Sequence, residues 1–183
     1  MNLNYSNLKL GIIGGGQLGK MLLQVTSRYN INSKILDPNN DSPCKNLCNE
    51  FFLGDLMDHD AVYEFGKKCD LVTYEIEHVN TKALEKLESE GIDIFPRPST
   101  LKIIQDKSMQ KKFFIENNIP TAKYRFFKSI SDFLEFSKNN DINLPCIWKK
   151  TKFGYDGYGV KKINSLNEIT DLPDSEFIIE DYV

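Results

Sequence analysis

The chain has 183 residues, of which 40% are hydrophobic and 27% charged, and its formal net charge is −3. These values are ordinary for a globular protein. The sequence contains neither the dense basic run of a nucleic-acid-binding protein nor an apolar stretch long enough to span a bilayer. Residues 1–8 are polar and lack the apolar segment of a signal peptide, so we expect a cytoplasmic protein without a nucleic-acid or membrane partner.

Residues 1–99 alternate between short apolar runs and amphipathic stretches. The run Lys9–Ile13 predicts a buried strand that ends at glycines, and the apolar spacing over Gln17–Tyr29 predicts a helix. The remaining elements of this part are expected as strands at residues 33–36, 51–53, 71–74 and 92–95, and as helices at 58–68, capped by Asp58, and 81–90. This alternation is typical of an α/β fold with a doubly wound parallel sheet.

The proline-containing stretch Phe95–Ser99 marks an expected domain boundary, so residues 100–183 are predicted to form a second domain. Its pattern differs from that of the first domain, because a largely helical segment comes first and strands then dominate. We expect helix at residues 100–118, strands at 123–127, 146–149, 159–163 and 177–180, and further helices at 131–139 and near Leu166.

A glycine-rich turn lies between the first predicted strand and helix, where the sequence reads GIIGGGQLGK. It contains the pattern Gly14-x-Gly16-x-x-Gly19. Backbone N–H groups converge at such a turn and the helix dipole favours an anion, while Asp37 lies near the position of a ribose-binding acid. The pattern is consistent with an NAD site, with a site for another phosphate ligand, or with a turn that only allows close helix packing.

A second glycine cluster follows the strand that ends at Lys149. Its sequence, FGYDGYGV at residues 153–160, is typical of a loop that folds over phosphates and donates backbone N–H groups to them. Lys149 would add a positive charge beside it, and Tyr155 and Asp156 could present a polar face to a second substrate. The alternative interpretation is a hairpin with turn residues.

Other polar residues give weaker signals. In VTYEIEHV, Glu75, Glu77 and His78 follow the end of a predicted strand, where open parallel sheets bind ligands, although a helix-capping loop has the same composition.

The four cysteines are scattered and the chain has two histidines, so we interpret the cysteines as reduced structural thiols and not as zinc ligands.

Taken together, these stretches resemble one family. GIIGGGQLGKML, LDP, VTYEIEHV, IQDK followed by QK, IPT, KFGYDGYGV and EDYV occur in the order typical of 5-(carboxyamino)imidazole ribonucleotide synthases, the ATPase subunits of phosphoribosylaminoimidazole carboxylase. These enzymes belong to the ATP-grasp superfamily. The resemblance covers essentially the whole chain and corresponds to the family's N-terminal half. It implies a preATP-grasp domain in residues 1–99 and the first part of an ATP-grasp domain in residues 100–183.

The resemblance also implies an activity. The family consists of ATP-dependent carbon–nitrogen ligases of de novo purine biosynthesis, which carboxylate aminoimidazole ribonucleotide with bicarbonate through carboxyphosphate. It implies ATP and Mg²⁺ as cofactors and a homodimer when complete. Family members continue past the position of Val183, so the Mg²⁺ ligands are expected outside this chain, and the chain is expected to be inactive alone. The alternatives are another ATP-grasp carboxylase or ligase, a non-catalytic nucleotide-binding module, and an NAD-binding domain.

Carried over position by position, the resemblance implies two sets of site residues. ATP would be bound by Lys107, Lys149, Gly154, Tyr155, Asp156, Gly157, Tyr158, Gly159, Val160, Glu180, Asp181, Tyr182 and Val183. Tyr155 and Asp156 would also lie near the aminoimidazole as the catalytic pair. The substrate would be bound by Gly16, Gln17, Leu18 and Glu75. Tyr158 departs from the family, which often has a basic residue there.

Overall fold

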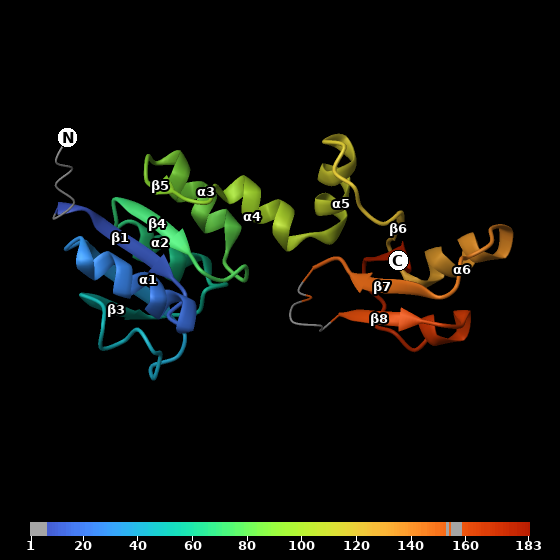
Figure 1. The fold of residues 1–183 in the computed structure, drawn as a ribbon, viewed down its shortest axis with the longest axis horizontal. Coiled ribbons are helices and arrows are strands. Elements are labelled where there is room, and N and C mark those ends of the chain that lie inside the picture. The colour runs from blue at the N-terminus through green and yellow to red at the C-terminus, as the bar shows by residue number, and fades with distance from the viewer. Residues whose placement is uncertain (1–6, 153, 155–158) are drawn as a thin grey trace. The chain divides into compact units, whose positions relative to one another are not determined.

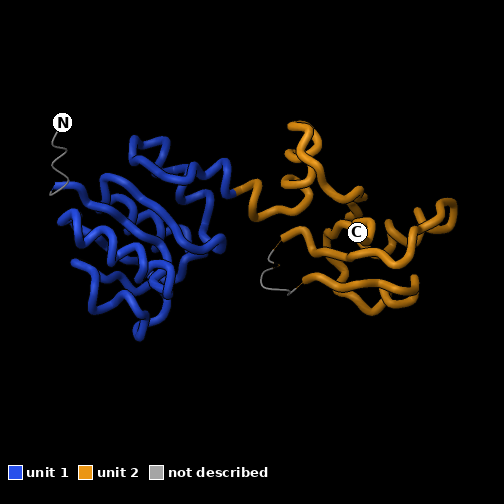
Figure 2. Tube along the Cα trace, viewed as in Figure 1, with its two compact units in different colours: residues 1–101 blue, residues 102–183 orange. Residues whose placement is uncertain are grey.

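The computed structural model describes residues 7–152, 154 and 159–183 (Figure 1). It divides into two compact units, residues 1–101 and residues 102–183 (Figure 2). Each unit has its own sheet and its own hydrophobic core, so each is described separately.

The first unit is built on a five-stranded sheet in the order β3-β2-β1-β4-β5, and all four strand pairs are parallel. Its strands are β1 (Lys9–Ile13), β2 (Asn32–Asp37), β3 (Glu50–Leu53), β4 (Leu71–Tyr74) and β5 (Asp93–Ile94). Its helices are α1 (Gln17–Arg28), α2 (His59–Gly66), α3 (Thr81–Ser89) and α4 (Pro98–Gln105), the last of which runs on into the second unit. The chain order reverses direction across the sheet between β1 and β4, which makes this the topological switch point.

Helices cover both faces of this sheet, because successive side chains of a strand point to opposite faces. In β1, Leu10 and Ile12 pack in a cluster with Leu23 of α1, whereas Ile13 packs in a cluster with residues of α2 and α3. The larger cluster includes Val62 and Phe65 of α2 and Ala83, Leu84 and Leu87 of α3. The predicted doubly wound α/β fold is therefore confirmed.

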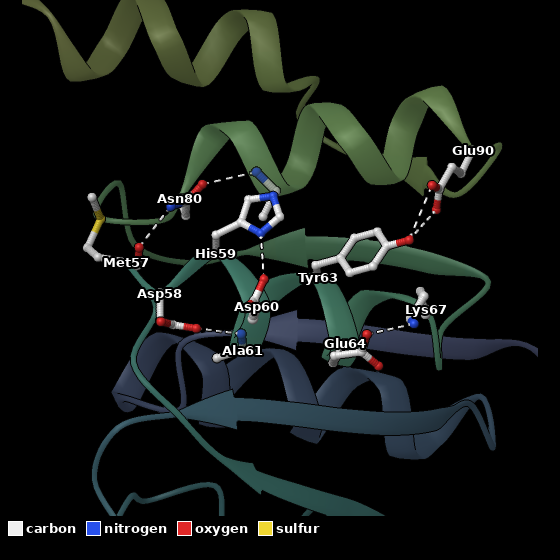
Figure 3. A network of polar contacts seen from close by, with 11 residues as sticks. Met57, Asp58, His59, Asp60, Ala61, Tyr63, Glu64, Lys67, Asn80 and Glu90 are labelled. Carbon is white, nitrogen blue, oxygen red and sulfur yellow. Dashed lines mark hydrogen bonds and ion pairs between the residues drawn. The ribbon is translucent and has the colours of Figure 1, made fainter.

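A polar network joins α2 and α3 on their solvent side (Figure 3). The Tyr63 hydroxyl donates to Glu90 Oε2 at 2.9 Å, and Lys86 Nζ lies 2.7 Å from Glu90 Oε1. The hydrogen bonds from Lys86 and Tyr63 lower the pKa of the Glu90 carboxyl. At the other end, Asp58 caps α2 by accepting a bond from Ala61 N at 2.7 Å, as its position in the sequence predicted.

The second unit contains a four-stranded sheet in the order β6-β9-β7-β8, in which every pair is antiparallel. Its strands are β6 (Tyr124–Phe127), β7 (Cys146–Lys150), β8 (Val160–Ile163) and β9 (Phe177–Asp181). Its helices are α5 (Lys107–Glu116), α6 (Ile130–Asn139) and the short 3₁₀ helix η2 (Leu166–Ile169).

Aromatic side chains dominate the core of the second unit. Phe133 of α6 lies edge-on to Phe127 of β6 at a centroid distance of 5.1 Å, and Phe127 stacks on Phe177 of β9 at 5.4 Å. Trp148 of β7 completes this cluster, 6.1 Å from Phe177. Because Phe177 and Ile179 of β9 belong to this core, Glu180, which directly follows Ile179, projects from the opposite face of the sheet.

The structure differs from the sequence-based expectations around the proline-containing stretch. Helix α4 begins at Pro98, inside that stretch, because proline is well tolerated in the first turn of a helix. The segment expected to be helical over residues 100–118 forms two helices, since Asp106 leaves the helical conformation and caps α5. Strand β5 is also shorter than expected.

The four cysteines are free thiols, three of them buried. Burial raises the pKa of Cys69 to about 12 and that of Cys44 to about 11. Such thiols are protonated at neutral pH and act as small apolar packing groups. Within the described residues, no helix combines the length and apolarity needed to cross a membrane.

Candidate functional site

The first candidate site is the glycine turn between β1 and α1. Gly14 has a φ of +98°, and a Cβ at this position would lie 2.8 Å from Glu75 Cγ. A Cβ on Gly19 would lie 2.6 Å from the carbonyl oxygen of Gly14, so the glycine lets the first turn of α1 approach the loop closely. Both positions therefore require glycine for a structural reason.

Two carboxylates, from the ends of the strands on either side of β1, close this turn. Asp37, at the end of β2, accepts from Gly15 N at 2.6 Å and from Asn39 N at 2.8 Å. Glu75, directly after β4, accepts from Gly16 N at 3.2 Å. Asp37 thus binds the glycine turn with one carboxylate oxygen and the segment after β2 with the other.

The start of α1 retains the features of an anion site. Gly16 is its N-cap and provides no side-chain hydrogen bond to the helix, so the first-turn N–H groups have no capping oxygen from that residue. Gln17 and Leu18 are exposed, Leu18 to 59%. The structure thus brings the four predicted substrate residues, Gly16, Gln17, Leu18 and Glu75, to one end of the first sheet, beside the switch point.

The second candidate site lies in the second unit, on the face of the sheet opposite the aromatic core. Lys149 Nζ of β7 lies 2.6 Å from Glu180 Oε2 of β9, and Lys111 Nζ of α5 lies 3.0 Å from Glu180 Oε1. The Glu180 and Lys111 side chains are only 7% and 9% exposed, whereas Lys149 is 28% exposed. A buried carboxylate thus shares two ammonium groups.

The beginning of α5 is tied to the segment that leads into the glycine-rich loop. Lys107 N donates to Thr151 O at 2.8 Å, and Lys107 Nζ donates to Gly154 O at 3.2 Å. Asp106 accepts from Ser108 N at 2.9 Å and lies 3.4 Å from Lys152 Nζ. Burial would raise the pKa of Asp106, but the hydrogen bonds from Ser108 and Met109 and the charge of Lys152 outweigh it, so the pKa is lowered.

The other predicted nucleotide residues are placed as follows. Gly159 has a φ of +75° and its carbonyl accepts from Lys150 N at 2.8 Å, while Val160 begins β8. Asp181 ends β9, and Tyr182 and Val183 follow it, with Tyr182 beneath Lys162 Nζ at 4.1 Å. The remaining predicted residues, Tyr155, Asp156, Gly157 and Tyr158, lie outside the described residues.

Residues 8–105 match the family model described as the ribonucleotide synthetase preATP-grasp domain. The chain belongs to this family. The preATP-grasp match contains the whole parallel sheet and the glycine turn, so the first candidate site lies within it.

Similarity to known proteins extends beyond the preATP-grasp domain. A chloroplastic phosphoribosylaminoimidazole carboxylase from Vigna aconitifolia is 36% identical over 166 residues, which are 91% of this chain and 29% of the plant protein. The carboxyaminoimidazole ribonucleotide synthase of Aspergillus clavatus, solved with ATP, is 32% identical with a TM-score of 0.86, over 98% of this chain and 48% of that one.

A second structure from the same fungus, an N5-carboxyaminoimidazole synthase with ADP and 5-aminoimidazole ribonucleotide, is 30% identical with a TM-score of 0.83. The match covers 98% of this chain and 47% of that one. The chain therefore spans about half the length of these synthases. The predicted resemblance is confirmed.

Sequence reasoning missed the role of Lys111 in the second site. Its signal was present in the motif IQDK followed by QK, because Lys107 and Lys111 are four residues apart and so share one face of a helix. The sequence placed both Lys149 and Glu180 among the nucleotide residues, but it did not indicate that they contact each other.

Proposed function

We propose that this chain forms the substrate-binding and first nucleotide-binding parts of an N5-carboxyaminoimidazole ribonucleotide synthase. Residues 1–99 would serve as the preATP-grasp domain and residues 100–183 as the N-terminal part of the ATP-grasp domain. The observation that carries the proposal is the match over 98% of this chain to the fungal synthase that holds ADP and aminoimidazole ribonucleotide. The reaction would be the ATP-dependent carboxylation of this ribonucleotide in purine biosynthesis.

The proposed chemistry is a phosphoryl transfer followed by a carboxyl transfer. A bicarbonate oxygen attacks the γ-phosphorus of ATP, ADP leaves, and carboxyphosphate forms. Carboxyphosphate releases carbon dioxide and inorganic phosphate, and the exocyclic amine of aminoimidazole ribonucleotide captures the carbon dioxide. The chain's residues would mainly orient the phosphates and neutralise their charge, which is what such reactions require of a protein.

For the ribonucleotide, the proposal uses the end of the first sheet. The phosphate would accept hydrogen bonds from the N–H groups of Gln17 and Leu18 in the first turn of α1, where the helix dipole favours an anion. Gly16 would allow close approach of the phosphate, and Glu75 would border the rest of the substrate. The support is that all four residues meet at the switch point of the sheet.

For ATP, the proposal uses the face of the second sheet that carries Lys149. Lys107 and Lys149 would contact the phosphates, residues 154–160 would cover them, and Glu180–Val183 would border the adenine. Tyr155 and Asp156 would lie near the aminoimidazole. The support is chemical, since ammonium groups and backbone N–H groups suit the anionic phosphates and the end of β9 carries backbone groups for a base.

Further parts of the proposal concern the complete enzyme. Among the described residues no group of three or more histidine, cysteine, aspartate or glutamate side chains could hold a metal ion. We propose that the Mg²⁺ ligands belong to the part of the synthases that this chain does not span, and that the chain alone binds substrates without turnover. We also propose a cytoplasmic homodimer for the complete enzyme.

Calorimetric titration of the chain with ATP tests the nucleotide part. Lys149→Ala should weaken ATP binding about 10- to 100-fold, because a hydrogen bond to a charged group contributes about 1.5–3 kcal/mol. Lys138→Ala, which removes an exposed lysine of α6, should leave the affinity unchanged and serves as the control. No ATP binding by the wild-type chain, or equal affinities for wild type and Lys149→Ala, would contradict the proposal.

A further inference from the structure

Lys111 is a buried lysine with an unusually full set of partners. Its ammonium group donates to Thr121 Oγ1 at 2.6 Å and to Ala122 O at 3.1 Å, and it lies 3.0 Å from Glu180 Oε1. It also lies 5.8 Å from the centroid of the Tyr124 ring. Three acceptors match the three donors of an ammonium group, so Lys111 is held in one position.

Glu180 stands between this fixed ammonium and a more exposed one. Oε1 faces Lys111 and Oε2 faces Lys149 at 2.6 Å. Two positive charges share one negative charge, so the cluster carries a net charge of +1 on a largely buried face. This surplus charge suits an anion, and Lys149, as the more exposed of the two lysines, is the group able to meet it.

A buried carboxylate that loses a partner is costly, because removing one member of a buried ion pair leaves an uncompensated charge. If Glu180 had Lys149 as its sole cation, turning Lys149 toward a phosphate would incur that cost. With Lys111 in place, Glu180 keeps an ion pair after Lys149 leaves. Lys111 can therefore keep Glu180 in an ion pair while Lys149 binds a ligand.

We infer that Lys111 is a positioning residue for nucleotide binding: it holds the Glu180 carboxylate so that Lys149 can move from Glu180 to a nucleotide phosphate. The inference rests on the proposed function, because it assumes that Lys149 meets a phosphate. Lys111 itself stays with Glu180, Thr121 and Ala122. The ligand class is a nucleoside triphosphate or diphosphate.

The experiment measures how fast Lys149 is acylated in the folded chain by sulfo-N-hydroxysuccinimide acetate. Site-resolved mass spectrometry gives the rate relative to that of exposed Lys138. In Lys111→Met and Lys111→Gln, Lys149 becomes the sole cation paired with Glu180. The stronger ion pair should make the Lys149 amine less available and slow its acylation about tenfold, the loss expected for one charge-assisted hydrogen bond. Lys111→Arg restores the charge and should restore the rate.

Two controls separate this effect from damage to the fold. Lys112→Ala removes the neighbouring exposed lysine of α5, which lies 3.7 Å from Glu116, so Lys149 should react at the wild-type rate. Cooperative unfolding followed by the fluorescence of Trp148 in the core of the same unit shows which variants fold. The neutral but polar Lys111→Gln serves where Lys111→Met does not fold.

ATP titration of the same variants completes the test. The affinity should fall about tenfold in the neutral variants, within the usual range of coupling between sites, and recover in Lys111→Arg. Unchanged acylation of Lys149 in a folded neutral variant overturns the inference, and so does slowed acylation with unchanged ATP affinity. Slowed acylation in a chain that binds no ATP at all contradicts the proposed function while supporting the coupling of Lys111 to Lys149.

Discussion

In the proposed substrate site, Gly16 would lower local stability in exchange for a binding role. At an N-cap, serine, threonine, aspartate and asparagine accept hydrogen bonds from the first turn, and glycine does not. The backbone of Gly16, with φ −71° and ψ −160°, is extended and open to any residue, so the chain does not need glycine here for its conformation. The absence of a cap leaves first-turn N–H groups of α1 available to a phosphate.

A substitution at this residue gives the first prediction. In Gly16→Ser the hydroxyl should cap α1 and compete with the phosphate, which should weaken binding of aminoimidazole ribonucleotide by about five- to tenfold, since a cap contributes about 1 kcal/mol. Calorimetric titration measures the affinity. Gly16→Ala adds the Cβ without the hydroxyl and is the matched control. Equal losses of affinity in both variants would indicate that the added Cβ crowds Glu75. They would contradict a role for the first-turn N–H groups in binding.

At the scale of elements, α5 begins at a charged cap that also contacts the segment leading to the glycine-rich loop. Asp106 is 10% exposed at its side chain, accepts from Ser108 and Met109, and lies beside Lys152. Its backbone pairs with Lys152 in an isolated antiparallel bridge. The same carboxylate therefore holds the start of the helix and the side chain of Lys152.

This arrangement predicts a pH-dependent stability. The folded-state pKa of Asp106 is lowered from its ordinary value of 3.8, so its contribution is fully present above that value and is lost as the pH falls through the folded-state pKa. Asp106→Asn keeps a capping oxygen but removes the charge. We expect the free energy of unfolding of Asp106→Asn to be about 0.5–1 kcal/mol lower than that of the wild type at neutral pH, with a smaller difference in acid.

Urea unfolding followed by Trp148 fluorescence at about pH 7 and about pH 3 measures this difference. Trp148 is the single tryptophan of the chain and is buried in the same unit as Asp106. Ser108→Ala, which removes one donor to the carboxylate, should show a smaller change of the same sign. If Asp106→Asn lost the same free energy of unfolding at both pH values, a stabilising role for the charged Asp106 carboxylate would be contradicted.

At the scale of the whole molecule, the two units have separate cores, and each should respond to its own mutations. Phe133 is fully buried in the aromatic core, so Phe133→Ala should destabilise the second unit by about 3–5 kcal/mol. Hydrogen exchange of β1 and β4 in the first unit should be unchanged, while the Trp148 transition moves to lower urea.

The neighbouring Leu134 of α6 provides the control for this prediction. It is 36% exposed, and Leu134→Ala should shift the Trp148 transition far less than Phe133→Ala. If Phe133→Ala accelerated exchange in the first sheet as much as in the second, the two cores would not be independent.

Sequence patterns were sufficient for features that depend on near neighbours. The strands Lys9–Ile13 and Leu71–Tyr74 were predicted with their observed bounds, because short apolar runs bounded by turn-forming or polar residues indicate buried strands. Asp58 was predicted as a cap for a similar reason, since a cap bonds to the N–H three residues later. The split at Asp106 was not predicted, because the segments on both sides of Asp106 consist mostly of residues that are compatible with a helix.

The amino-acid sequence alone indicates which residue types lie at or near the strand ends: glycines after β1, an acid at the end of β2, another acid after β4, and a lysine in β7. Which of them contact each other depends on the three-dimensional fold. Glu75 reaches the backbone of Gly16 across 59 positions because β1 and β4 are adjacent, and Lys149 reaches Glu180 across 31 positions because β7 and β9 pair. The periodicity of the sequence predicts the face of the sheet on which a side chain lies. Its contact partner depends on strand order and register, which are set by packing of the whole core.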